Sequence, residues 1–324
     1  MGIALKTMTL QLFRIIMPLP SHFSALAKLS ACMGLLCLFS NTVIAATDEK
    51  LQLVTTIKPL QLISQAIAGD KANISVLLPA TQSPHHYSMS PSDRFSLNKA
   101  DLFIWVGPPL EVFFIDTVAQ LSQSVPVITA IELESLNTLP LIDSHVHENH
   151  AAAAIDPHIW LDPDNAVVIA QSIVTHLVTI DAKNADYYRL NFTRFEHSLQ
   201  ALKSEIQSQL EAIRDRPYIV YHNAYQYFER QFALQHSLAL VTNPESQPSI
   251  RQILQTREQL KNIEPVCLLL EQDSPSATIK TFLGNAQLRQ STLDLLGGSI
   301  AVDEHAYENL LRKLSSQISN CLQD

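Results

Sequence analysis

The chain has 324 residues, 47% of them hydrophobic and 16% charged, and its formal net charge at pH 7 is -9. A negative chain without a basic run offers no patch for nucleic acid or anionic lipid, so these partners are excluded. The acidic balance is compatible with a cationic ligand, although solubility alone explains it equally well.

The first 45 residues are typical of a secretory signal peptide. Their only charges are Lys6, Arg14 and Lys28, and an apolar run over 29–39 precedes small residues suited to cleavage after Ala45. This run is too short to span a bilayer as a helix. The sequence therefore predicts an exported protein, and about 280 residues remain, enough for two lobes of ordinary size.

Short apolar runs alternate with helical patterns in the first half of the remaining chain. This alternation predicts a parallel sheet flanked by helices, in an N-terminal α/β lobe that covers 46–181. The predicted strands are 51–57, 74–78, 102–106 and 125–129, and the predicted helices include 60–68, 95–99 and 166–177.

A small histidine cluster, His145, His147 and His150, lies near the end of this lobe. Imidazoles this close together on an acidic loop can recruit zinc weakly and pass it to a main site. A solvated loop with incidental histidines is an equally good interpretation, because the segment is short.

One long helix is predicted over 182–215, with Asp181 as its N-terminal cap. Its hydrophobic residues recur at steps of three and four, which keeps them on one face, and no Gly or Pro interrupts it before Pro217. About 30 helical residues span roughly 45 Å, which is longer than one small lobe is wide. We therefore expect this helix to join two lobes rigidly.

The alternation of strands and helices resumes in a C-terminal α/β lobe over 216–324. The predicted strands are 218–221, 238–241, 266–270, 291–293 and 300–302, and the predicted helices are 225–231, 250–262, 276–286 and 307–322.

Only two cysteines, Cys267 and Cys321, lie outside the predicted signal peptide. In an oxidising compartment such an isolated pair tends to form a disulfide, whose loop-closure entropy is worth about 4 kcal/mol before strain is subtracted. Two free thiols that bind metal are the alternative.

Four residues with metal-binding side chains, His85, His158, His222 and Asp294, follow predicted strands or lie in loops bracketed by proline. Ligands of parallel sheets bind outside the carboxyl ends of the strands, where such residues can meet. Three imidazoles and a carboxylate suit zinc. The ligands of structural zinc sites are usually a few residues apart in the sequence. The four residues of this chain are separated by roughly 60 to 75 positions, which favours a site that binds and releases metal over one that only stabilises the fold.

Two further residues border this predicted site. Glu271 directly follows a predicted strand, and it either orients a metal ligand or forms hydrogen bonds between the lobes. His86 is adjacent to His85, and because neighbouring residues rarely bind the same small ion, we expect it at the rim.

The chain resembles the metal-binding receptor proteins of ABC transporters, and among them the zinc-binding periplasmic branch. The resemblance extends over about 51–322, and it rests on motifs that occur in the family's order. These motifs include Ser83-Pro84-His85, Ala100-Asp101-Leu102, Asp156-Pro157-His158-Ile159-Trp160, Tyr221-His222-Asn223-Ala224-Tyr225 and Thr292-Leu293-Asp294.

The resemblance implies two α/β lobes, each with a parallel sheet, joined by one long rigid helix. It implies that His85, His158 and His222 supply nitrogens to a transported zinc ion, and that Asp294 adds a carboxylate oxygen or shares that position with water. A disulfide in the C-terminal lobe is usual in the zinc branch. The implied partners are a membrane permease and its cytoplasmic ATPase, and the implied state is a periplasmic monomer.

One position departs from the family pattern, and another bears on the choice of metal. Pro84 stands where some relatives carry an acidic residue that reaches the metal, which puts more weight on Asp294 or water. Manganese-binding relatives place a carboxylate where His222 stands, and a nitrogen-rich shell favours zinc over manganese.

Three alternatives to a zinc receptor are compatible with such a metal site. The first is a receptor for manganese or another divalent metal, and the second is a secreted zinc-dependent hydrolase. The hydrolase is disfavoured because the sequence has no HExxH motif or comparable combination of metal and base, so no enzyme is predicted. The third is an adhesin or zinc buffer without a transporter.

Overall fold

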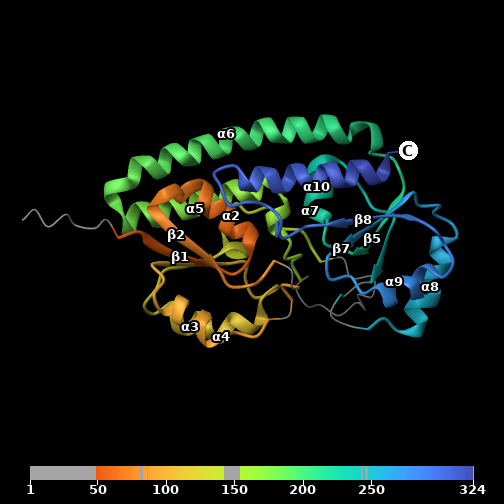
Figure 1. The fold of residues 1–324 in the computed structure, drawn as a ribbon, viewed down its shortest axis with the longest axis horizontal. Helices are drawn as coiled ribbons and strands as arrows, with labels where there is room; N and C mark the ends of the chain where they lie inside the picture. Colours follow the sequence, from red (N-terminus) through yellow and green to blue (C-terminus); the bar gives the residue numbers. More distant parts are fainter. Residues whose placement is uncertain are drawn as a thin grey trace, which may run out of the picture. The chain divides into compact units, whose positions relative to one another are not determined.

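The structure, a computed structural model, describes residues 49–80, 83–85, 87–141, 154–241, 244 and 247–323. Two parallel four-stranded sheets flanked by helices, together with one long helix, make up this part of the chain (Figure 1). The predicted fold class is confirmed. Among the described residues, no helix has both the length and the apolar character needed to cross a membrane.

The first sheet has the strand order β2-β1-β3-β4. Its strands are β1 (Leu51–Thr55), β2 (Ala72–Val76), β3 (Leu102–Trp105) and β4 (Val127–Thr129). All pairs are parallel, as the alternation with helices predicts. β3 is buried along its whole length, which explains why it is a continuous apolar run in the sequence.

The second sheet repeats this arrangement with the order β6-β5-β7-β8, again with parallel pairs only. Its strands are β5 (Tyr218–His222), β6 (Leu238–Val241), β7 (Cys267–Glu271) and β8 (Arg289–Leu293). The strand predicted at 300–302 is wrong, because this segment is a bend followed by irregular chain. Val302 is 45% exposed, and the Ile300 carbonyl accepts a hydrogen bond from Lys58 Nζ instead of a strand partner.

Helices cover both sheets. They are α2 (Lys58–Ala68), α3 (Pro91–Asn98), α4 (Ile115–Leu121), α5 (Pro163–Ile180), α7 (Gln226–Phe232), α8 (Ile250–Leu260), α9 (Ser276–Leu283) and α10 (Ala306–Leu322). α3 starts four residues before the predicted helix, because Ser90 and Asp93 form a capping box and Pro91 occupies the first turn. The Asp162 side chain caps α5 by accepting a hydrogen bond from the backbone N–H of Asp164.

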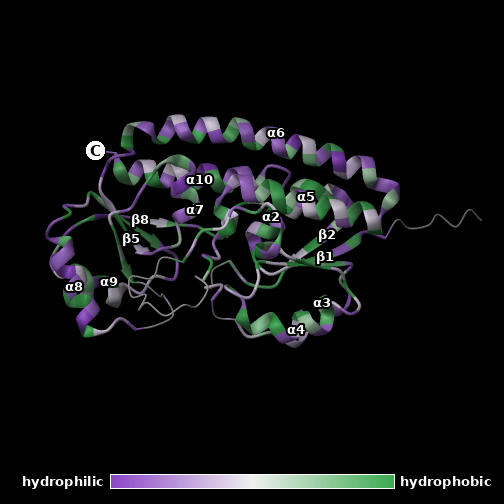
Figure 2. Cartoon of the chain, turned by 180° about the vertical axis from the view of Figure 1, so that it is seen from behind, coloured by the Kyte–Doolittle hydropathy of each residue, from purple (hydrophilic) through white to green (hydrophobic). Residues whose placement is uncertain are grey.

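The long helix α6 (Ala185–Leu210) has 26 residues. It packs against α2, α5 and α10, its buried residues include Phe195, Leu199 and Leu202, and hydrophobic and hydrophilic residues are mixed along it in Figure 2. Short 3-10 turns at Ala182–Asn184 and Glu211–Ile213 flank it, so the predicted continuous helix is divided at both ends. The predicted domain boundaries at 181 and 215 remain predictions.

Asp181 was expected to cap this helix, and that expectation is wrong. The side chain makes no cap hydrogen bond to the backbone. Its Oδ2 instead accepts hydrogen bonds from Tyr188 Oη at 2.5 Å and from Asn184 Nδ2 at 2.7 Å. Asp181 therefore joins the start of α6 to the turn before it, and its backbone carbonyl also accepts a hydrogen bond from the Asn184 N–H at 3.1 Å.

The larger hydrophobic core includes residues of both sheets, such as Leu53 of β1 and Val220 of β5, together with residues of α2, α6 and α10. A smaller core lies in the second half of the chain and includes Leu268 and Phe282. The predicted disulfide between Cys267 and Cys321 is present and ties the last turn of α10 to β7.

Candidate metal centre

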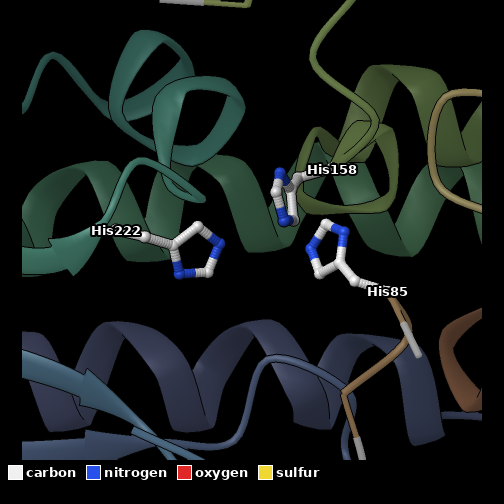
Figure 3. Close-up of side chains that lie close together, drawn as sticks. All are labelled: His85, His158 and His222. Atoms are coloured by element: carbon white, nitrogen blue, oxygen red, sulfur yellow. The ribbon is translucent and has the colours of Figure 1, made fainter. Parts of the chain in front are cut away.

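Three histidines from distant parts of the chain meet at one point. His85 lies in the loop between β2 and α3, His158 precedes a 3-10 turn at Ile159–Leu161, and His222 is the last residue of β5. One ring nitrogen from each lies within 4.8 Å of those of the other two. Figure 3 shows the three rings pointing toward one another from three different segments.

Local structure explains why these side chains converge. His222 sits at the carboxyl end of a central strand, where side chains leave the sheet toward its ligand edge. His158 is held in a tight turn, in which its own N–H donates to Asp156 Oδ1 and the N–H of Ile159 donates to the Pro157 carbonyl. His158 and His222 are buried and His85 is half-buried, so only His85 approaches solvent appreciably.

The histidines line a cavity of about 250 Å³. Its wall also includes Pro84, Trp160 and the two predicted site residues Glu271 and Asp294. A divalent cation with several waters fits a cavity of this size. The mixture of apolar wall and few polar groups is typical of a binding site for a small ligand.

Asp294 lines this cavity but does not belong to the group of converging ligand atoms. Its Oδ1 accepts a hydrogen bond from the Gly298 N–H at 2.8 Å, and its Oδ2 accepts one from the Ser299 N–H at 2.9 Å. Burial alone would raise the pKa of the Asp294 carboxyl, but these bonds and the nearby Lys313 lower it. The carboxylate organises its own turn, and its assignment as a metal ligand stays a prediction.

Glu271 stands behind His222. Its Oε2 lies 3.0 Å from His222 Nδ1, and its Oε1 accepts a hydrogen bond from Tyr225 Oη at 2.8 Å. The His222 contact has the distance of an ion pair but not the direction of a hydrogen bond, because neither ring nitrogen has a hydrogen-bond partner among the described residues. Burial alone would lower the pKa of His222, but the charge of Glu271 raises it. Its hydrogen bonds to Tyr225 and Ser274 stay within the second half of the chain, and its role in orienting a metal ligand stays a prediction.

Asp156 has the corresponding place behind His158, a role that was not predicted from the sequence. It is fully buried, and its Oδ1 lies 2.7 Å from His158 Nδ1. Burial alone would raise the pKa of Asp156, but His158 and the hydrogen bond from Gln226 lower it. The signal in the sequence was an acidic residue two positions before a histidine, with a proline between them.

Several predicted residues lie outside the described part of the chain. These are the signal peptide, His86 and the auxiliary cluster of His145, His147 and His150. The auxiliary site and the leader therefore stay predictions.

Three converging imidazoles can bind a borderline-soft divalent metal through nitrogen when they are neutral. Because Asp156 occupies Nδ1 of His158, the Nε2 of that ring is the atom left for a metal. A shell built mainly from nitrogen suits zinc better than manganese, which prefers oxygen ligands.

Comparison with known proteins identifies similar chains. A family model described as "ZnuA: Zinc-uptake complex component A periplasmic" matches residues 53–321. The chain is 33% identical to the high-affinity zinc uptake system protein ZnuA of Yersinia pestis over 287 residues, which covers 83% of this chain and 90% of that protein.

Solved structures share the fold. A crystal structure of ZnuA aligns with a TM-score of 0.73 at 22% identity, covering 85% of this chain and 100% of that one. FpvC from Pseudomonas aeruginosa, solved in complex with Mn²⁺, aligns with a TM-score of 0.69 at 22% identity, covering 85% and 99%. Structural similarity at 22% sequence identity establishes the fold only. The identity of the metal depends on the side chains of this chain.

Proposed function

The chain belongs to the ZnuA family of periplasmic zinc-uptake components, and from that premise we propose that it captures Zn²⁺ in the periplasm and delivers it to the membrane permease of an ABC transporter. The single observation that supports this most is the meeting of the nitrogens of His85, His158 and His222 within 4.8 Å. Zinc is the transported cargo and is not consumed or altered, so the chain acts as a receptor and not as an enzyme.

The geometry fits a receptor for two reasons. The three ligands come from separate segments, so small movements of these segments can loosen the shell and release the ion. Three protein ligands leave a coordination position to be filled by water or by Asp294 when zinc is bound. The permease works with a cytoplasmic ATPase, and the receptor acts as a monomer after removal of the predicted leader.

Zinc is proposed over manganese because the converging group contains nitrogen ligands only. The mutation of one ligand tests this assignment directly. We expect His222→Ala to lower the affinity for zinc at least tenfold, since each ligand fixes part of the shell. Isothermal titration of the metal-free protein with Zn²⁺, and separately with Mn²⁺, measures affinity, stoichiometry and preference.

The matched control is His176→Ala, because His176 lies on α5 with its Nδ1 near the Ser172 carbonyl and lies outside the converging group. We expect the unmodified protein to bind one zinc ion per chain, with a higher affinity than for manganese. The His176→Ala control should bind zinc with the same affinity as the unmodified protein. Equal zinc binding by the unmodified protein and by His222→Ala would overturn it.

A further inference from the structure

Two of the converging histidines have a carboxylate on the side of the ring that faces away from the site. Asp156 Oδ1 lies 2.7 Å from His158 Nδ1, and Glu271 Oε2 lies 3.0 Å from His222 Nδ1. A carboxylate that hydrogen-bonds to Nδ1, as Asp156 does for His158, fixes the tautomer and the angle of the imidazole, and so prepares the opposite nitrogen for a metal. The orientation of the carboxylate therefore controls the orientation of the ligand.

Residues of one short segment donate hydrogen bonds to both carboxylates, those of Asp156 and Glu271. Tyr225, Gln226 and Tyr227 are consecutive residues at the start of α7. Tyr225 Oη donates to Glu271 Oε1 at 2.8 Å, and Gln226 Nε2 donates to Asp156 Oδ2 at 2.7 Å. Tyr227 Oη donates to the backbone carbonyl of Asp156 at 2.8 Å.

The hydrogen bonds of this segment connect the two halves of the chain. The segment follows directly after β5, whose last residue is the predicted ligand His222, whereas Asp156 and His158 precede α5 in the first half of the chain. The hydrogen bond between Gln226 and Asp156 joins residues separated by 70 positions. Any movement of α7 relative to the 156–158 turn therefore changes the support of His158.

Of the three residues, Gln226 can be substituted with the least disturbance of the hydrophobic core. The tyrosines are buried aromatic residues whose rings also fill the core, so their loss would disturb packing. Gln226 is half-buried, and its amide contacts Asp156 Oδ2 closely and the Pro140 carbonyl at 3.4 Å. The contact between Asp156 and His158 is also the better aligned of the two carboxylate contacts.

We propose that Gln226 is a positioning residue for zinc capture: it holds Asp156 so that His158 presents Nε2 to the ion, and it ties this turn to the segment that follows β5 and His222. The inference rests on the proposed function and deepens it. It assigns the alignment of His158, a ligand in the first half of the chain, to a single amide from the second half.

The test is a set of variants measured with two metals. In Gln226→Met the side chain keeps its length but loses the donor, and we expect about tenfold weaker zinc binding by titration. We also expect an altered visible absorption spectrum of bound Co²⁺, which reports the arrangement of the ligands and which a purely structural loss would leave unchanged. Gln61→Met is the matched control, because Gln61 Nε2 donates to the Ile74 carbonyl at 2.8 Å and Gln61 is not among the cavity-lining residues.

A double-mutant cycle distinguishes action through Asp156 from action elsewhere. If Gln226 works through Asp156, Gln226→Met adds little to the loss caused by Asp156→Asn, so the two effects are clearly not additive. Additive losses, or a Gln226→Met protein with unchanged zinc affinity and Co²⁺ spectrum, overturn the inference. The proposed function fails separately, if His222→Ala binds zinc as tightly as the unmodified chain.

Discussion

At the scale of single residues, Glu111 is a carboxyl group in an unusual environment. It is fully buried, and its Oε2 accepts hydrogen bonds from the N–H groups of Val106 and Gly107 at 2.9 and 3.0 Å. Burial raises its pKa to about 7, although the nearby Thr56 hydroxyl and the hydrogen bonds from Gly107 and Val106 oppose this shift. The folded protein therefore keeps a proton on Glu111 over a pH range in which the unfolded chain has lost it.

This difference predicts how stability depends on pH. Between pH 4.5 and about 7 the folded state binds one more proton at Glu111 than the unfolded state, so the free energy of unfolding falls as pH rises. Glu111→Gln keeps an oxygen acceptor but cannot ionise. We expect this variant to unfold less readily than the unmodified protein at pH 8, by up to about 3 kcal/mol, with a much smaller gain at pH 5.

Urea unfolding at pH 5 and pH 8 measures this effect. Glu196→Gln is the control, since Glu196 is exposed on α6 and its substitution should shift stability little at either pH. A Glu111→Gln protein whose stability relative to the unmodified chain is the same at both pH values would show that Glu111 ionises normally.

At the scale of elements, the sequence predicted most strands but fewer helix boundaries. Strands such as β3 were visible because burial on both faces makes them continuous apolar runs. α4 was not predicted, because its seven residues are too few to show a helical period and only Leu121 is buried. The false strand at 300–302 starts with a bend at Ile300, which is half-buried against the core, and its other two residues, Ala301 and Val302, are exposed.

The candidate site was predictable to a similar degree. Histidines at strand ends stand out in a sequence, because the carboxyl edge of a parallel sheet gathers them. The residues that orient these histidines do not stand out in the sequence, because the hydrogen bond between Gln226 and Asp156 depends on how α7 packs against the 156–158 turn. The orientation of the Asp294 carboxylate is likewise a property of the turn at Gly298 and Ser299 and not of the residue type.

The disulfide gives a prediction for the last helix. The bond between Cys267 and Cys321 spans 54 positions, so it removes considerable freedom from the unfolded chain. We expect Cys321→Ser to lower the free energy of unfolding by about 2 to 4 kcal/mol, because α10 loses its tie to β7.

Chemical unfolding with and without a reducing agent measures this loss. The reductant should destabilise the unmodified protein by a similar amount and should leave the Cys321→Ser protein unaffected. If reduction changes neither protein, then the bond contributes nothing to stability.

At the scale of the whole described molecule, both sheets share one hydrophobic core with α2, α6 and α10. Polar contacts reinforce this union: Arg312 of α10 pairs with Glu205 of α6 at 3.1 Å, and Lys58 of α2 donates to the Ile300 carbonyl at 2.6 Å. A hinge between the halves would have to open this core, so zinc release is expected to depend on loops around the cavity.

Rigidity of this kind can be measured as a distance. We expect spin labels at Asp70→Cys and Glu258→Cys, whose native side chains are 72% and 70% exposed, to move by less than about 2 Å when zinc is added. Labels at Asp70→Cys and Glu132→Cys, both in the first half of the chain, provide the reference for a fixed pair. A shift of many ångströms between the halves would point to a hinged clamp instead.

The shared core also limits how proteins of this design can be altered. A chimaera built from halves of two different relatives would need matching core side chains along α2, α6 and α10. Exchanging halves is therefore a poor route to a new ion preference. A designer who wants this scaffold to select another metal should replace single cavity residues such as His222 and leave the buried framework untouched.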